Sequence, residues 1–181
     1  MAELIGKSII GSQPGDEGHP TLFGINPATG ESLQPGYAVV SEVELNRAAG
    51  LAARAFETLG KTSGAARAVF LRKIADNIEA IGDDLAKCAP QETGLPEGRI
   101  RMETGRTCGQ LRLFASVVEE GSWVDARIDH ADPEREPVPK PDVRSMERPL
   151  GPVAVFCASN FPLAFSVAGG DTASAFAAGC P

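Results

Sequence analysis

Apolar residues recur at three- and four-residue steps between about residues 41 and 121, which is the spacing of one face of an α-helix. The first such stripe follows Ser41-Glu42-Val43-Glu44, a capping box in which the Ser41 hydroxyl and the Glu44 carboxylate satisfy each other's main-chain NH groups. The pattern predicts a helix that ends at Gly60. Its apolar positions are Leu45, Ala48, Ala49, Ala52, Phe56 and Leu59.

Three further helices are expected before residue 122. Ser63 can cap the second, and a shorter third helix is predicted from Asp83 to Ala89. The fourth is predicted from Pro96 to Gly121, because proline suits the first turn of a helix and glycine its C-terminal cap. The expected inward positions are Ala66, Phe70, Ile74, Ile78 and Ile81 in the second helix and Ile100, Leu111, Phe114 and Val118 in the fourth.

The residues before the first helix carry short strand signals broken by turns. Lys7-Ser8-Ile9-Ile10 is followed by a turn-forming stretch, residues 11–15. Phe23 to Glu31 includes Asn26-Pro27-Ala28-Thr29-Gly30, which is typical of a connection between two paired strands. This part of the chain is therefore predicted to form hairpins.

The last thirty residues predict a strand, a tight turn and a helix. Val153 to Cys157 is a continuous apolar run, as in a strand that is buried on both faces of a parallel sheet. A turn follows, and a helix is expected from Pro162 to Gly179. Such a unit is completed by a second parallel strand, for which the 181 residues contain no candidate.

Residues 127–148 differ from the rest in composition. Four prolines alternate with charged residues there, so no helix is expected. The stretch suits either a surface linker or an extended arm that pairs with another subunit, and the composition leaves both interpretations open.

Charge and composition exclude several classes of function. Seventeen basic and 24 acidic residues give a net charge of −7, which disfavours nucleic acid and anionic membranes as partners. No apolar run approaches the roughly 18 residues of a spanning helix, and Met1 to Lys7 lack a secretory signal pattern. Four scattered cysteines and two histidines, His19 and His130, predict no metal site and favour reduced thiols in a cytoplasmic protein.

The turn after the apolar run is the candidate for chemistry, and it has three interpretations. Asn160 can cap the following helix through its side-chain oxygen. Ser159 can act as a nucleophile on a strand-to-helix elbow, although Cys157 and Phe161 stand where that motif has glycines. The Asn160 amide can instead donate to an oxyanion. Local sequence favours the cap and leaves the oxyanion donor open, whereas Cys157 suits inert packing.

Two stretches read Arg148-Pro149-Leu150-Gly151-Pro152-Val153-Ala154-Val155 and Ser159-Asn160-Phe161-Pro162-Leu163. Together they resemble the start of the cofactor-binding core of the aldehyde dehydrogenase superfamily. Asn26 to Glu31, the two amphipathic helices and Glu92-Thr93-Gly94 follow the family's order at similar separations. The resemblance covers nearly the whole chain.

The resemblance implies an α/β fold that is the N-terminal part of such an enzyme. Residues 1–126 are then the N-terminal strands and helices of a Rossmann-type cofactor domain, with the hairpins leading into the helices. Residues 127–148 match the family's oligomerisation arm, so a homo-oligomer is expected through this segment. Residues 149–181 match the first strand, turn and helix of the dinucleotide-binding core.

The resemblance also implies roles in aldehyde oxidation with NAD or NADP as the cofactor. In the family, a cysteine thiolate attacks the aldehyde, hydride passes to the cofactor, and a glutamate-activated water releases the acid. Asn160 matches the asparagine that donates to the oxyanion. Phe156, Cys157, Ala158 and Ser159 match the strand end that lines the cofactor. Many members have tryptophan where this chain has Ser159.

Three side chains match positions that meet the substrate. Phe161 and Phe165 match residues of the aldehyde tunnel, and Arg106 falls near its mouth, where a guanidinium would hold a distal carboxylate. The family's nucleophilic cysteine, base glutamate and cofactor lysine would all lie beyond Pro181, so the 181 residues alone are expected to be inactive.

Two stretches near the end of the chain, Phe156 to Ser166 and Gly169 to Ala175, are most similar to the branch that oxidises 2-oxoglutarate semialdehyde (2,5-dioxopentanoate). That aldehyde is the expected small-molecule partner. The alternative is a non-catalytic binding or assembly module that retains the first half of the fold.

Overall fold

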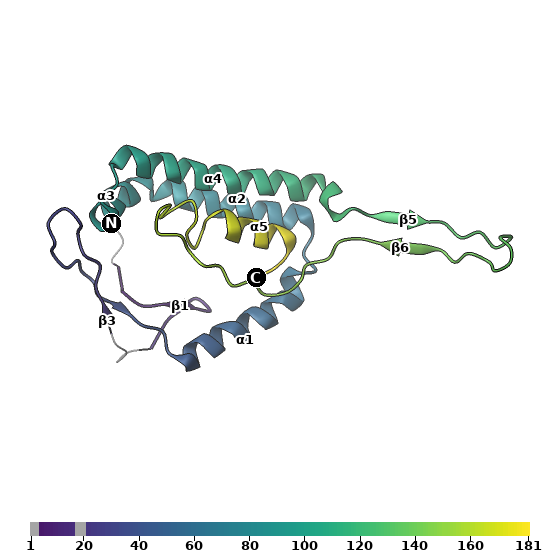
Figure 1. Ribbon diagram of the computed structural model, residues 1–181, viewed down its shortest axis with the longest axis horizontal. Coiled ribbons are helices and arrows are strands. Elements are labelled where there is room, and N and C mark those ends of the chain that lie inside the picture. Colours follow the sequence, from purple (N-terminus) through teal and green to yellow (C-terminus); the bar gives the residue numbers. More distant parts are fainter. Residues whose placement is uncertain (1–3, 17–20) are drawn as a thin grey trace.

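The structure is a computed structural model that describes residues 4–16 and 21–181 (Figure 1). His19 lies outside the described residues. Within them the chain forms α1 (Glu42–Leu59), α2 (Gly64–Ala80), α3 (Gly82–Thr93), α4 (Glu97–Glu120), the 3₁₀ helix η1 (Ser122–Val124) and α5 (Gly170–Ala178). None of these helices combines the length and the hydropathy of a membrane span.

The core lies between α2, α4 and α5. Figure 1 shows α2 and α4 side by side, with α5 packed against both, and α3 continues α2 at the end of α4 remote from η1. The buried side chains are mostly small, which lets the helix axes approach closely. They are Ala68, Leu71 and Ala75 of α2, Cys108, Leu111, Ala115 and Val118 of α4, and Ala173 and Ala177 of α5.

The predicted caps of α1 and α2 are confirmed. The Ser41 hydroxyl accepts from the Glu44 NH, and the Glu44 carboxylate accepts from the Ser41 NH, so the capping box is complete. Ser63 caps α2 through the Ala66 NH. Pro96 stands at the N-cap of α4, one residue before the helix, and α3 is longer than predicted at its C-terminal end.

The predicted inward face is right for α4 and wrong for α2. In α4, Ile100, Leu111 and Val118 are buried, and Phe114 packs against the core. In α2 the buried face lies one residue, or about 100°, from the predicted stripe. Small residues decide the difference, because Ala75 lets the Cys108 Sγ come within 3.5 Å of its carbonyl oxygen.

The residues of the predicted stripe of α2 are less buried than Leu71 and Ala75. Ile74 and Ile78 are partly buried against the core, and Ala66, Phe70 and Ile81 are exposed. The Phe70 ring meets the ring of Phe176 of α5 edge-on, with a centroid separation of 5.4 Å.

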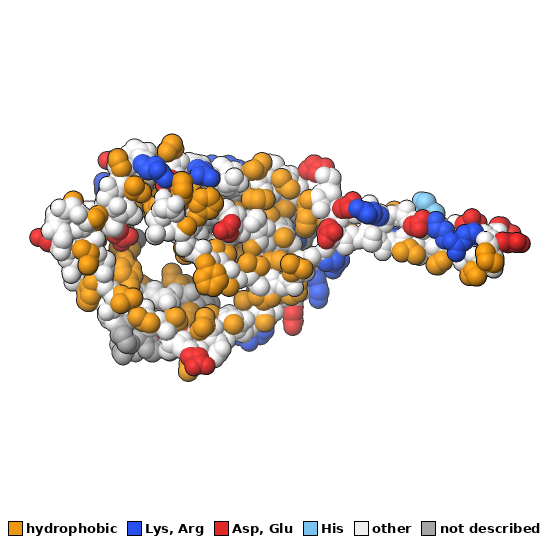
Figure 2. Space-filling model, viewed as in Figure 1, with side chains coloured by type: hydrophobic (Ala, Val, Ile, Leu, Met, Phe, Trp, Pro, Cys, Tyr) orange, Lys and Arg blue, Asp and Glu red, His pale blue; other side chains and the backbone are white. Residues whose placement is uncertain are grey.

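The first helix is much less buried than its apolar stripe predicts. Glu44 is the one residue of α1 that is buried in the described structure, and Leu45 is 58% exposed. Figure 2 shows an opening between the N-terminal strands and the layer of α2, α4 and α5, bordered in part by hydrophobic side chains. The predicted stripe of α1 is at most half-buried, and none of its residues belongs to the core.

The strands pair only as antiparallel two-stranded sheets in the described part of the chain. β1 (Ile9–Ile10) pairs with β2 (Gln13–Pro14), and β3 (Thr21–Leu22) pairs with β4 (Tyr37–Ala38). The connection after β3 is the predicted turn, where the Asn26 carbonyl accepts from the Gly30 NH at 2.8 Å.

The predicted parallel strand and the predicted start of the last helix are both wrong. Residues 152–158 adopt no strand, and Val153 and Phe156 are 46% and 89% exposed. An extended segment becomes a strand only where neighbouring strands complete its hydrogen bonds, and no described strand lies beside this one. α5 begins at Gly170, eight residues after Pro162, and ends with Gly179 at φ +92° as its C-cap.

Residues 127–148 form a hairpin that extends away from the helices (Figure 1). β5 (Arg127–Asp129) pairs antiparallel with β6 (Val143–Ser145), with Ile128 opposite Arg144. A further bridge joins Asp132 to Lys140 near the tip. The absence of a helix is confirmed, and the segment is an arm with internal pairing rather than an unpaired linker.

Candidate functional site

The segment that holds most of the predicted site residues is closed by its own main chain. The Ala158 NH donates to the Phe165 carbonyl at 2.8 Å and joins the two ends of what we name the 158–165 loop. Inside it, the Phe161 NH donates to Ala158 at 3.3 Å and the Phe165 NH donates to Phe161 at 3.2 Å. The loop therefore has a defined shape without being a helix or a strand.

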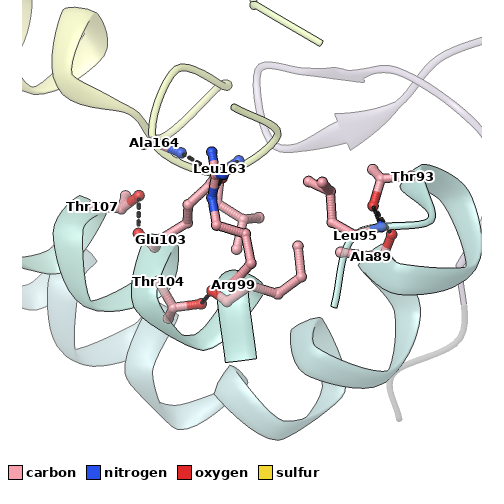
Figure 3. Close-up of polar contacts among 10 residues, drawn as sticks. Ala89, Thr93, Leu95, Arg99, Glu103, Thr104, Thr107, Leu163 and Ala164 are labelled. Atoms are coloured by element: carbon pink, nitrogen blue, oxygen red, sulfur yellow. Dashed lines mark hydrogen bonds and ion pairs between the residues drawn. The ribbon is translucent and has the colours of Figure 1, made fainter. Parts of the chain in front are cut away.

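A buried carboxylate of α4 joins the 158–165 loop to the helices (Figure 3). Glu103 is 2% exposed, and its Oε2 accepts from the main-chain NH groups of Leu163 at 3.2 Å and Ala164 at 3.4 Å. Its Oε1 accepts from the Arg99 Nε at 2.8 Å, one helical turn away. Both oxygens of the carboxylate are therefore hydrogen-bonded.

Three of the predicted residues meet at the surface of this loop. The rings of Phe161 and Phe165 pack edge-on with centroids 5.4 Å apart, and we name them the aromatic pair. The Arg106 guanidinium lies 5.5 Å from the Phe161 centroid and 5.0 Å from the Phe165 centroid. Arg99 lies over Phe161 at 4.8 Å. Two cations thus border the aromatic pair, at distances where cation–π attraction operates.

The two cations differ in how their charge is balanced. Arg99 is paired with the buried Glu103. Arg106 is exposed and has no carboxylate partner among the described residues. The positive charge that remains available beside the aromatic pair is therefore that of Arg106.

Asn160, which directly precedes Phe161 in the chain, is exposed and does not cap a helix. The N-cap of α5 is Gly169, so the capping interpretation of Asn160 is wrong. The elbow interpretation of Ser159 is also wrong, because neither a strand nor a helix adjoins that residue in the structure. His130 is exposed in the arm, between β5 and the tip.

The four residues that match the family's cofactor-lining strand end lie at the surface. Phe156, Cys157 and Ser159 are exposed, and Ala158 is half-buried. A cavity of about 200 Å³ separates this stretch from α5, and Cys157 and Phe176 are among its lining residues. Of the four residues, Cys157 lines this largely apolar groove.

None of the four cysteines forms a disulfide in the described structure. Burial raises the pKa of the Cys108 thiol. Burial, and then the charge of Glu92, raises the pKa of Cys88. Both effects favour the protonated thiol, which is a poor nucleophile and a poor metal ligand. The described residues hold no cluster of three potential metal ligands, either.

Arg99 and Glu103 are functional candidates that sequence reasoning missed. The signal was present in the inward face of α4, where Glu103 follows the buried Ile100 by three residues and precedes Thr107 by four. A charged residue at an inward position requires a partner, and the i,i+4 arginine supplies part of one. The rest comes from the 158–165 loop, sixty residues along the chain.

Comparison with known proteins places this fold. The model of the aldehyde dehydrogenase family matches residues 16–181. The chain is 51% identical to alpha-ketoglutaric semialdehyde dehydrogenase 2 of Azospirillum brasilense and 47% identical to alpha-ketoglutaric semialdehyde dehydrogenase of Acinetobacter baylyi. Each alignment spans 99% of this chain and 34% of the relative. The chain thus spans about a third of the length of these curated relatives.

The architecture agrees with a solved structure as well. A point mutant of betaine aldehyde dehydrogenase from Staphylococcus aureus, in complex with NAD⁺, superimposes with a TM-score of 0.80 at 22% identity. The match covers 98% of this chain and 35% of that one, so the observed α/β arrangement corresponds to about a third of that fold. On the evidence of the family model and the two close relatives, the chain belongs to the aldehyde dehydrogenase family.

Proposed function

We propose that the full-length protein oxidises 2-oxoglutarate semialdehyde to its dicarboxylate with NAD⁺ or NADP⁺ as the hydride acceptor. The identity to two relatives named for this aldehyde supports the substrate. The observation that carries the proposal is the meeting of Arg106 with the aromatic pair, next to the exposed Asn160.

Asn160 has the role of oxyanion donor in this proposal. When a nucleophile adds to the aldehyde carbon, the carbonyl oxygen takes an electron pair and gains negative charge. An amide NH of Asn160 then donates to that oxygen, and the interaction is stronger in the transition state than in the bound aldehyde. The exposure of Asn160 and its freedom from helix capping support this role.

Arg106 and the aromatic pair select the substrate. Phe161 and Phe165 form an apolar wall for the carbon chain, and Arg106 holds the distal carboxylate through two parallel NH···O hydrogen bonds. Arg99 is unsuited to that task because Glu103 already balances its charge. Arg106 is therefore assigned to the substrate.

The nicotinamide cofactor is assigned to the stretch Phe156, Cys157, Ala158 and Ser159, of which Cys157 lines a groove beside α5. The groove of about 200 Å³ beside α5 is apolar enough to cover a flat ring, and the exposed backbone next to it offers hydrogen-bonding groups, so these residues fit the cofactor. When bound, the cofactor would supply the hydride acceptor for the oxidation of the aldehyde carbon after the nucleophile has added to it. The residues of this chain hold and orient it.

The arm is assigned to contacts between subunits of a homo-oligomer. β5 and β6 pair only with each other in the described structure, so each keeps one free edge. Ile128 and Val143 are 56% and 52% exposed on these strands. A free edge with apolar side chains suits pairing with a strand of another copy.

The proposal is tested by measuring the formation of NADH or NADPH by the full-length protein. We expect turnover of 2-oxoglutarate semialdehyde at a kcat/KM well above that of an uncharged aldehyde of equal length. Arg106→Gln removes the cation and should raise KM for the semialdehyde by about tenfold or more, with little change for the uncharged aldehyde. Arg54→Gln, at an exposed position of α1, is the matched control.

Two results would count against the proposal. An equal loss for both aldehydes in Arg106→Gln would refute the assignment of Arg106. No reduced cofactor with any aldehyde would refute the activity and favour a binding or assembly module.

A further inference from the structure

Two arginine–glutamate pairs of equal spacing lie on α4 and have different surroundings. Arg101 and Glu97 pair at 2.8 Å with side chains 50% and 58% exposed, so solvent screens them. Arg99 and Glu103 also pair at 2.8 Å, but their side chains are 32% and 2% exposed. Burying a charged carboxylate costs desolvation free energy, which hydrogen-bonding partners must offset. Glu103 has such partners in addition to Arg99.

Those additional partners belong to the 158–165 loop. The NH groups of Leu163 and Ala164 both point at Glu103 Oε2 (Figure 3). In the described structure, Glu103 is the one side chain outside the loop that forms hydrogen bonds with it. A loop without regular secondary structure takes its position from a few such contacts, and a charged acceptor makes them stronger than a neutral one.

We propose that Glu103 is a positioning residue that sets the 158–165 loop on α4 and thereby aims Asn160 and the aromatic pair. The proposal rests on the proposed function and names a residue through which that site is held. Glu103 acts in two ways at once. Its Oε2 fixes the main chain three residues beyond Asn160, and its Oε1 holds Arg99 over the ring of Phe161.

Glutamine is the informative replacement at position 103 because it keeps the size of the side chain. A carboxylate offers acceptors on both oxygens, whereas an amide offers one oxygen and an NH₂ group. In Glu103→Gln the single oxygen can accept a hydrogen bond from either Arg99 or the loop. The NH₂ group then faces the NH groups of the other partner and cannot form a hydrogen bond with them. The loop should shift or loosen while the helices stay packed.

Hydrogen–deuterium exchange of the full-length protein tests the contact without reference to activity. Glu103→Gln should accelerate exchange in peptides that cover residues 158–165. Glu97→Gln, which breaks the exposed pair of the same helix, should leave those peptides unchanged. Unchanged exchange in Glu103→Gln would overturn the proposal even if the enzyme proves active.

A double-mutant cycle tests the link to Asn160. Glu103→Gln alone should lower kcat for the semialdehyde by about tenfold or more, since small misplacements of catalytic groups carry large rate penalties. In an Asn160→Ala background the same change should have little further effect, because the group that it aims is gone. Independent, multiplicative losses would mark Glu103 as merely structural and contradict the proposal.

The two experiments separate the two proposals. An inactive wild-type protein would refute the proposed function, and the exchange result would still decide whether Glu103 holds the loop. An active wild type with unchanged exchange in Glu103→Gln would refute the positioning role alone.

Discussion

The helices and the segment from residue 151 to residue 169 are held in place by different means. α2, α4 and α5 share one core, in which Ala68, Leu71 and Ala115 are fully buried. The 151–169 segment has no regular secondary structure, and much of it is exposed. Main-chain hydrogen bonds hold it, including one from the Val153 NH to the Pro181 carbonyl, together with the Glu103 carboxylate.

This difference separates stability from function. The helices bury apolar surface and therefore carry most of the free energy of folding. The 151–169 segment contains Asn160, Phe161 and Phe165, whose side chains are at least partly accessible to a ligand. Residues that must meet a substrate cannot also be sealed in a core, so their position depends on a few polar anchors.

The largest expected effect on stability comes from the core. Leu71→Ala should lower the free energy of unfolding of the full-length protein by about 2–5 kcal/mol, because Leu71 is fully buried and leaves a cavity. Leu150→Ala, at a residue 98% exposed beside the 151–169 segment, should change it by less than about 0.5 kcal/mol. Denaturant titration measures both. Equal losses would contradict the assignment of most of the folding free energy to the core of α2, α4 and α5.

A smaller effect is expected where the segment joins α5. A Cβ at Gly169 would lie 2.5 Å from the Ala164 carbonyl oxygen, so Gly169→Ala forces the backbone apart. We expect a loss of about 1–3 kcal/mol, typical of overpacking. At Gly170 a Cβ meets nothing within 4 Å, and Gly170→Ala should change stability by less than about 1 kcal/mol. Equal melting temperatures for the two variants would contradict this account of the junction.

The sequence predicts the helices well because their signals are local. Ser41, Ser63, Gly60 and Gly121 mark helix ends through contacts within one turn, and the structure confirms each of them. The inward face of α2 is wrong because it depends on how closely α4 approaches. Small residues such as Ala75 set the distance between the two helices. A prediction based on the spacing of large apolar residues does not take them into account.

The 151–169 segment is predicted less well because its structure depends on distant partners. Val153 to Cys157 has the composition of a buried strand, yet it lacks a described neighbour to pair with. Arg106 meets Phe161 and Phe165 in the structure, and their place in a substrate tunnel stays a prediction from family resemblance. Glu103 was missed because its role appears only when α4 and residues 163–164 come together.

The most direct test of the central claim is kcat of the full-length Asn160→Ala variant with 2-oxoglutarate semialdehyde. Loss of one oxyanion donor should lower kcat by about 10²–10³, with the affinity for the cofactor unchanged. Asn77→Ala, an exposed asparagine of α2, should retain wild-type kcat. A loss of less than about threefold in Asn160→Ala would mean that Asn160 does not stabilise the transition state.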